Sequence, residues 1–183
     1  MCLIKNRRKA FTLVEMMVAM AIGSLVILAC AAFSFYACRS YAAMSNYSDL
    51  DEQGQLALDK FTQQVRQVRG LNSYSSTTNG VITGLTFTDY DGGTLIFSYD
   101  PIARTLSRVK GSTTNLYLSG CDSLQFAICQ RNPQPFTFDA VPTSVATNCK
   151  LVKVTWTCSR NIYSGDKANT ESVQSAKVAI RGN

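Results

Sequence analysis

The alternation of apolar and polar residues divides the chain into three parts with different periods. Residues 11–38 are almost entirely apolar and contain one charged residue, Glu15. Residues 47–68 keep a helical spacing of three and four, whereas the chain after residue 80 alternates with a period of two. These periods belong to helices and strands respectively, so the pattern predicts a long N-terminal helix packed on an antiparallel β-sheet, an α+β fold.

The apolar run is long enough to cross a membrane. A spanning helix needs ~20 apolar residues, and residues 11–38 supply 28. No proline interrupts residues 11–70, and the amphipathic pattern continues the helix beyond the apolar run. We therefore predict one helix of about 60 residues, which at 1.5 Å per residue is about 90 Å long. The alternative is a separate amphipathic helix after a break near residues 39–48.

The second half of this helix is predicted to pack against the sheet through one face. Arg66 and Arg69 are placed in the last turn, where cations suit the helix dipole, and Gly70 is expected to cap the end. The predicted apolar face consists of Tyr47, Leu50, Gly54, Leu58, Phe61, Val65 and Val68.

The remaining residues are predicted to form the sheet. Residues 72–80 are rich in Ser, Thr, Asn and Gly and are predicted to be a linker. Turn signals at residues 91–93 and 100–101 separate the first three strands into a β-meander. The predicted strands cover residues 81–89, 94–99, 104–109, 116–118, 123–129, 150–158 and 172–180.

The distribution of charge excludes a general polyanion-binding protein. The net charge is +6, but four basic residues precede the apolar run and the rest of the chain carries only +2. A charge this small gives no case for nucleic-acid binding. By the positive-inside rule, the basic leader stays in the cytoplasm and the chain beyond Cys38 is expected outside it.

Neither catalysis nor a metal or cofactor is predicted. The chain lacks His, the commonest general base and metal ligand, and shows no nucleophile–base pair. Asp89 and Asp91 raise the alternative of a calcium site, but a hairpin turn is preferred because the spaced acids of a calcium loop are missing. Four aromatic residues are assigned to the sheet core rather than to a stacking surface for bases: Tyr90, Phe97, Tyr99 and Trp156.

The first residues of the chain resemble the N-terminal signal of type IV pilins and pseudopilins. The resemblance is carried by Lys9–Glu15 (KAFTLVE), by its position near residue 10 and by the apolar run behind it. It implies that a prepilin peptidase cleaves between Ala10 and Phe11 and methylates the new amine of Phe11. The family usually has Gly before the cut, and Ala10 is the nearest residue to Gly in size.

Glu15 is the residue that a plain anchor or a secretory signal peptide does not explain. A carboxylate in an apolar helix costs roughly 2.5–3.5 kcal/mol at the helix centre on insertion scales, and secretory signals lack such an acid. The resemblance implies that Glu15 pairs with the Phe11 amine of a neighbouring subunit, which offsets the burial of both charges. The alternative is a solvated Glu15 at the membrane boundary.

Residues further along the helix resemble one subgroup of this family. Asp51–Leu58 and Val65–Gln67 are similar to W-type minor pilins and to J-type minor pseudopilins of type II secretion, which sit at or near filament tips. The resemblance implies a minor pilin or pseudopilin precursor. Its expected partners are other pilins or pseudopilins, the prepilin peptidase and the inner-membrane assembly platform. The alternative is a binding module on a pilin stalk, such as an adhesin or a DNA-uptake subunit, using the head or the 133–147 loop.

These inferences give an expected division of the chain. The parts are a leader, residues 1–10; a membrane or filament-core helix, residues 11–38; the amphipathic half of the same helix, residues 39–70; and a β-sheet head, residues 71–183. We expect a single pass through the inner membrane, with the head outside the cytoplasm and later carried into a pilus or pseudopilus.

Four cysteines of the head are expected to form two disulfides. An exported domain favours disulfides, and the spacings of Cys121, Cys129, Cys149 and Cys158 match no zinc-binding pair. Bonds within a strand are excluded, because two cysteines eight residues apart in a strand lie ~26 Å from each other at about 3.3 Å per residue.

Pairing the two cysteine-bearing strands antiparallel gives a register. With Cys129 opposite Cys149, Phe126 faces Val152 and Leu124 faces Val154, and these four apolar residues share the face opposite to the cysteines. Cys121 and Cys158 are then one residue out of register and on opposite faces unless a bulge intervenes. The predicted bridges are Cys129–Cys149 and, with such a bulge, Cys121–Cys158.

Overall fold

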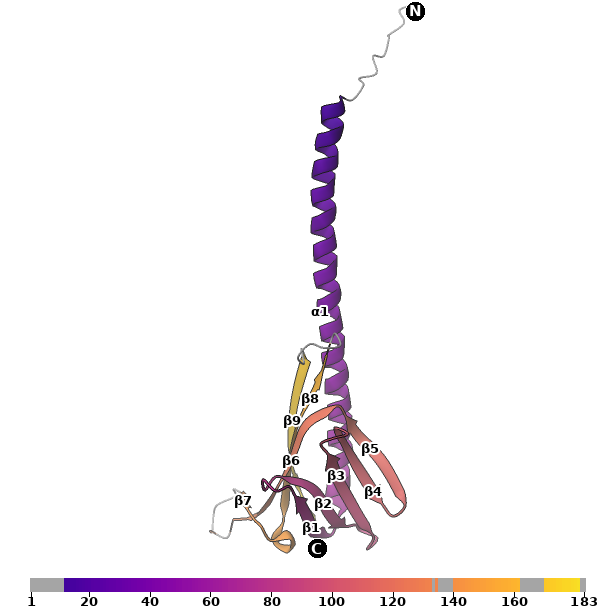
Figure 1. The fold of residues 1–183 in the computed structure, drawn as a ribbon. Coiled ribbons are helices and arrows are strands. Elements are labelled where there is room, and N and C mark those ends of the chain that lie inside the picture. Colours follow the sequence, from indigo (N-terminus) through magenta and orange to yellow (C-terminus); the bar gives the residue numbers. More distant parts are fainter. Residues whose placement is uncertain (1–11, 133, 135–139, 162–169, 182–183) are drawn as a thin grey trace, which may run out of the picture. The chain divides into compact units, whose positions relative to one another are not determined.

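The computed structural model describes residues 12–132, 134, 140–161 and 170–181 (Figure 1). One long helix, α1 (Leu13–Gln67), precedes the sheet. The chain divides into two compact units, Met1–Ala42 and Ala43–Asn183. The second unit contains the C-terminal part of α1 and all the described strands, so the α+β prediction is confirmed.

All strand pairings are antiparallel, and the order along the sheet is β5-β4-β3-β2-β6-β8-β9, with β1 paired to β2 and β7 to β6. The sheet curls around the second half of α1 (Figure 1). Strands β2 to β5 are consecutive in the chain and adjacent in the sheet, which confirms the predicted meander. The strands are β1 (Gly70–Ser76), β2 (Ile82–Thr88), β3 (Thr94–Asp100), β4 (Thr105–Lys110), β5 (Thr113–Ser119), β6 (Cys121–Arg131), β7 (Ala140–Pro142), β8 (Leu151–Arg160) and β9 (Thr170–Ala179), with a 3-10 turn, η1 (Ala146–Asn148), before β8.

The continuous helix agrees with the prediction, and the alternative of a break near residues 39–48 is wrong. Its end differs, because α1 stops at Gln67 and Gly70 is the first residue of β1 rather than a cap. The backbone N–H of Arg69 already donates to the carbonyl of Thr88 at 2.8 Å. The helix therefore ends before the predicted cap, because the chain from Arg69 onwards is hydrogen-bonded to the sheet.

The expectation of a linker over residues 72–80 is wrong for its first half. Residues 70–76 form β1 and pair along β2, and Leu71 is buried. The composition of Ser, Thr and Asn concealed this strand, since those residues are as common in turns as in strand edges. The register also shifts twice between β1 and β2, which breaks the alternation that would have identified the strand.

The core lies between the sheet and one face of α1. Phe61 is fully buried and makes an edge-to-face contact with Phe97 at 4.9 Å and a stacked contact with Phe126 at 5.9 Å between ring centroids. Trp156 is buried in the same core. Aromatic pairs of this kind stabilise by about 0.5–1.5 kcal/mol beyond the area that they bury, so Phe61 helps to hold the helix on the sheet.

The predicted helix face is confirmed in its centre and differs at its edges. Leu50, Gly54, Phe61, Val65 and Val68 are buried as predicted, and Ala57 joins them. Leu58 is half-buried, and Tyr47 is 54% exposed because it precedes the buried stretch. Among the aromatics, Tyr90 is also outside the core, since it lies in the β2–β3 turn and is 62% exposed.

The last strand, β9, carries polar side chains on part of its inward face. Val173 is 61% exposed, whereas Thr170, Ser172 and Val178 face inward and are buried. Gln174 also faces inward, and its amide donates to the carboxylate of Asp51 on α1 at 3.0 Å. The inward face of β9 is thus polar where it meets this part of the helix, and Val173 lies on the outward face.

Candidate functional site

The start of α1 is closed by a reciprocal pair of side chains. The backbone N–H of Thr12 donates to Glu15 Oε2 at 2.8 Å, and the backbone N–H of Glu15 donates to Thr12 Oγ1 at 3.3 Å. The Thr12 hydroxyl also donates to the same carboxylate oxygen at 3.1 Å. This is a capping box, in which two backbone donors at a helix start are satisfied by side chains.

The capping box gives Glu15 a local partner that the sequence analysis missed. The signal was present as the spacing T-x-x-E before an apolar run. The carboxylate also lies in the first turn of the helix, where the dipole favours a negative charge. Ala10 and Phe11, the predicted cleavage and methylation residues, lie outside the described residues, so the pairing of Glu15 with an amine stays a prediction.

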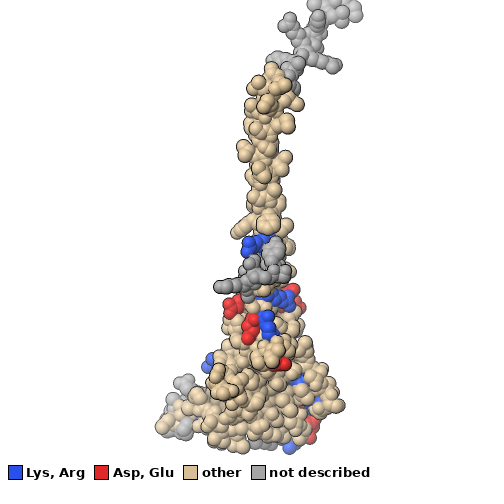
Figure 2. Space-filling model, viewed as in Figure 1, with Lys and Arg blue, Asp and Glu red and all other residues tan. Residues whose placement is uncertain are grey.

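The part of α1 in the first unit is apolar and uncovered. Within the described residues, α1 is the helix that is long and apolar enough to span a membrane, with a mean hydropathy of 2.4 over its most apolar window. Its exposed side chains include Leu13, Val18, Leu25 and Ile27. Figure 2 shows no charged atoms along the upper part of this stretch on the face in view; Arg39 lies near its end, and charged side chains gather over the second unit. Water is a poor solvent for such a surface, and lipid or another apolar helix is a suitable one.

The register between the two cysteine-bearing strands differs from the prediction by two residues. Cys129 faces Leu151 rather than Cys149, and Phe126 faces Val154 rather than Val152. A shift of two keeps every inward residue on the same face, so the alternation could not distinguish the two registers. The observed register places Trp156 of β8 opposite Leu124, and both side chains are buried.

A bulge at the start of β6 brings Cys121 opposite Cys158. The register shifts between Cys121 and Ser123, so Asp122 is the extra residue and both cysteines lie on the buried face. The thiol of Cys158 beside it, followed by burial, raises the pKa of Cys121 above its usual range. The structure records both as thiols, and this arrangement is the one that the predicted Cys121–Cys158 bridge required.

The polar groups that this bulge releases have partners. The Tyr99 hydroxyl lies 3.0 Å from each of the carbonyl oxygens of Cys121 and Asp122, which leave the regular ladder at the bulge. The Asp122 carboxylate pairs with Arg104, whose backbone carbonyl accepts from Cys121 N–H at 2.9 Å. Burial raises the pKa of Tyr99, so its hydroxyl remains a donor. These contacts fix the position of Cys121 independently of any bond to Cys158.

The other two cysteines are close but not directly opposed. Cys149 precedes β8 and is buried, and Cys129 is half-buried near the end of β6. The carbonyl of Cys129 accepts from Lys150 N–H at 2.9 Å, next to Cys149. The pKa of Cys149 is raised overall, because burial outweighs the opposite effect of a hydrogen bond with the backbone of Cys129. The predicted Cys129–Cys149 bridge remains a prediction with a different register from the one assumed.

Asp89 and Asp91 form a closed hairpin turn. Gly92 adopts a φ of 84°, and its N–H donates to the Asp89 carbonyl at 3.0 Å. Both carboxylates pair with the ammonium of Lys110, which is 2.9 Å from Asp91. Lys110 holds the pKa of Asp91 below its ordinary value. Among the described residues, no group of three or more His, Cys, Asp or Glu is placed to hold a metal ion.

Comparison with known protein families finds a match at the N-terminus. Residues 5–31 match the prokaryotic N-terminal methylation motif. The match covers the basic leader, the predicted cut, Glu15 and the first part of the apolar run. It supports a type IV pilin or pseudopilin precursor that a prepilin peptidase processes and that assembles with other pilins, a structural rather than catalytic protein. No curated protein matches the chain.

Proposed function

We propose that this chain is the precursor of a minor pilin or pseudopilin, closest to the W-type pilins and to the J-type pseudopilins of type II secretion. The observation that carries the proposal is the methylation motif at residues 5–31, set on an apolar helix that continues into the β-sheet unit. An ordinary membrane anchor does not require its helix to continue unbroken into the folded unit. A subunit whose helix both packs in a filament core and backs its head does.

In this proposal the parts of the chain have successive roles. The leader, residues 1–10, holds the precursor in the cytoplasmic leaflet and is removed. Residues 11–38 cross the inner membrane once and later pack in the fibre, while residues 39–70 and 71–183 lie outside the cytoplasm. The assembly platform would move the mature subunit into a type IV pilus or a type II pseudopilus, at or near its tip.

Glu15 has a specific role in the proposed assembly. Cleavage creates an amine on Phe11, four residues before the carboxylate. In the apolar interior of a fibre, an unpaired ammonium or carboxylate is strongly disfavoured. A Glu15 that enters the fibre would exchange part of its capping contacts for the Phe11 amine of a neighbour, which fixes the axial position of the two subunits.

Cleavage and methylation are tested together by mass spectrometry of the N-terminus. The chain is expressed with and without an active prepilin peptidase, and the first peptide of each product is sequenced. The expected product begins at N-methylphenylalanine 11 and requires the peptidase. Ala10→Gly is the matched variant and is expected to be cleaved at least as fast. A chain that still begins at Met1 with active peptidase overturns the proposal. So does a chain cut beyond residue 28, inside or after the apolar run, as a secretory signal peptide would be.

Placement at the tip needs a separate test. An epitope tag at the C-terminus is labelled with gold particles on sheared fibres, and the particles are located by electron microscopy. Particles at one end of each fibre support a minor tip subunit. Particles along the whole length assign the chain to the major subunits and contradict the minor placement while leaving the processing result intact.

A further inference from the structure

Strand β5 is an open edge of the sheet that carries no charge. Within the described residues, β5 pairs with β4 alone and ends the strand order. Its sequence, TTNLYLS over Thr113–Ser119, has no Lys, Arg, Asp, Glu or Pro. Natural edge strands are usually protected from pairing by charges, proline or coverage. The backbone of β5 is therefore available to a further strand.

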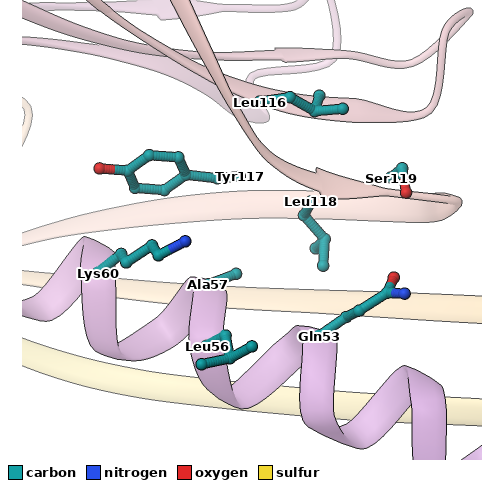
Figure 3. A pocket seen from close by; sticks show the side chains of 8 residues that line it. All are labelled: Gln53, Leu56, Ala57, Lys60, Leu116, Tyr117, Leu118 and Ser119. Atoms are coloured by element: carbon teal, nitrogen blue, oxygen red, sulfur yellow. The ribbon is translucent and has the colours of Figure 1, made fainter.

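A groove lies beside this edge, between β5 and the helix of the same unit. It has a volume of about 220 Å³ and is lined from α1 by Gln53, Leu56, Ala57 and Lys60, and from β5 by residues 116–119. Figure 3 shows Leu118 directed towards Ala57, with Gln53 and Lys60 on either side. A strand added to β5 would continue the curl of the sheet over this groove.

A bulge in β5 gives both faces of the edge an apolar residue. The register with β4 shifts at Tyr117, so Tyr117 and Leu118 both face inward. The Tyr117 ring packs on Phe97 at 5.8 Å, and Leu118 is buried. Leu116 then remains 62% exposed, and Leu56 on the helix flank is 51% exposed. Alternate side chains of an added strand would cover these two leucines.

The charge on the groove wall is unbalanced. Lys60 makes no ion pair with any described residue, and the other residues that line the groove carry no charge. The helix positions three and four residues away from Lys60 carry no charge, and neither does β5. An ammonium in a groove without an anion favours a ligand that brings a carboxylate.

We propose that the edge of β5 and this groove bind an extended, acidic segment of a partner protein by strand addition. Main-chain hydrogen bonds to β5 give the binding energy, and side chains at alternate positions give specificity. Side chains of the added strand cover Leu56 and Leu116, and a carboxylate meets Lys60. The surface belongs to the second unit alone, and the inference does not depend on incorporation into a fibre.

Three labelled peptides test this inference on the full-length chain in detergent micelles. The first alternates Val and Thr over ten residues, has one central Glu and ends in a Gly-Ser tail for solubility. The second replaces the Glu with Lys. The third keeps the Glu but carries N-methyl groups on every backbone nitrogen of the Val/Thr segment, which removes the hydrogen-bond donors along both edges of the peptide. Binding is measured by fluorescence anisotropy at two salt concentrations.

The Glu peptide is expected to bind, and the N-methylated peptide to bind at least about tenfold more weakly. Lys60→Gln is expected to weaken the Glu peptide by about two- to fivefold and to remove its preference over the Lys peptide. Lys153→Gln, an exposed lysine on β8, is the matched control and is expected to change neither. Equal binding of the methylated peptide, or no binding of the Glu peptide up to about 1 mM, overturns the proposal.

Two exposed residues on opposite edges locate the site. Leu116→Asp on β5 is expected to abolish binding, while Val173→Asp on β9 is expected to leave it unchanged; circular dichroism checks that both variants fold. Loss of binding with Val173→Asp alone moves the site to β9 and contradicts the proposal. A concentration-dependent dimer that Leu116→Asp dissociates, in a chain that binds no peptide, assigns the edge to a second copy and also contradicts it.

Discussion

At the scale of single residues, Glu15 has two possible partners, one within its own chain and one in a neighbour. Its carboxylate accepts from Thr12 in the described chain, and the proposed assembly adds the Phe11 amine of another subunit. The two contacts serve different ends. The first orders the helix start, and the second is an ion pair that exists only between subunits. Substitutions that keep one contact and remove the other separate them.

Glu15→Gln and Glu15→Ala are expected to lose incorporation into fibres by at least about tenfold, because breaking a buried ion pair costs about 3–5 kcal/mol. Gln still closes a capping box, so Glu15→Gln removes only the charge. Thr12→Val removes the hydroxyl, costs about 0.5–2 kcal/mol of helix stability, and is expected to incorporate. The measurement is the ratio of subunit in sheared fibres to subunit in membranes. Normal incorporation of Glu15→Gln would show that only the cap matters.

Gly54 allows the side chain of Gln174 to lie directly on the helix. A Cβ at position 54 would be 2.6 Å from Gln174 Nε2, the atom that donates to Asp51. Gly→Ala alone favours a helix by about 0.8–1.0 kcal/mol, but here it displaces Gln174 and its hydrogen bonds, each worth about 1 kcal/mol. We expect Gly54→Ala to be neutral or destabilising in the natural chain.

The same substitution is expected to stabilise a Gln174→Ala background by about 0.8–1.0 kcal/mol, since the obstacle is gone. A double-mutant cycle by urea unfolding in micelles measures the coupling, which we expect to be about 1–2 kcal/mol. Additive effects of the two substitutions would mean that Gln174 yields to the Cβ at no cost, and that the glycine has another reason.

At the scale of elements, the β2–β3 turn is held by one ammonium between two carboxylates. Lys110 on β4 pairs with Asp89 and Asp91 and also lies 5.3 Å from the centre of the Tyr90 ring. Hydrogen bonds to Asp89 and Asp91 raise the pKa of Lys110 from 10.5 to about 12. The hydrogen bond from Lys110 lowers the pKa of Asp91 below 3.8.

The signs of these shifts define a pH window. An acid with a lowered pKa stabilises the fold fully above about pH 4, its ordinary pKa being 3.8. The Asp91 contribution therefore declines as the pH falls below about 4 and is lost once the pH has passed through the lower folded pKa. A base with a raised pKa stabilises the fold fully below 10.5 and loses this as the pH rises towards 12. The difference in unfolding free energy between the natural chain and Lys110→Gln should be constant between these limits and shrink outside them. A difference independent of pH would show that the pairs do not contribute.

The cysteine strands supply the second prediction at this scale. In the oxidised chain, Cys121→Ala combined with Cys158→Ala is expected to lower the free energy of unfolding by about 2–4 kcal/mol, the usual effect of losing one disulfide. Under reducing conditions the difference should fall to the smaller effect of trimming two thiols. Non-reducing peptide mapping should give a Cys121–Cys158 linked peptide. A Cys121–Cys129 peptide would contradict the strand assignment itself, because the two residues are eight positions apart along the extended strand β6.

At the scale of the whole molecule, the periods of the sequence predicted which helices and strands form better than they predicted the register between strands. The long helix, its buried face around Phe61 and the meander follow from spacing alone, because burial on one face requires that spacing. The register of β6 on β8 does not, because registers two residues apart place the same side chains inside. In the structure Cys121 faces Cys158 and Asp122 forms the bulge, which selects one of these registers, and neither feature leaves a mark on the alternation.

The candidate site was predictable to a similar extent. Glu15 and the leader are visible as a motif, whereas the partner of Glu15 within the chain depends on reading Thr12 as a helix cap. β1 was missed because its polar residues suit a loop equally well. The groove beside β5 could not be predicted, since it arises where the sheet ends around the helix, and no local pattern encodes the end of a sheet.

The division into two units predicts which part of the chain needs a membrane. The exposed apolar side chains of α1 are concentrated in residues 13–36, whereas the core cluster from Leu50 to Ile180 lies entirely in the second unit. A fragment of residues 43–183 should therefore be soluble without detergent and unfold cooperatively in urea, as a unit with its own core does. Phe61→Ala is the matched test of that core and should lower its unfolding free energy by about 3–5 kcal/mol. A fragment that aggregates, or that is insensitive to Phe61→Ala, would show that the head depends on the apolar half of the helix for its fold.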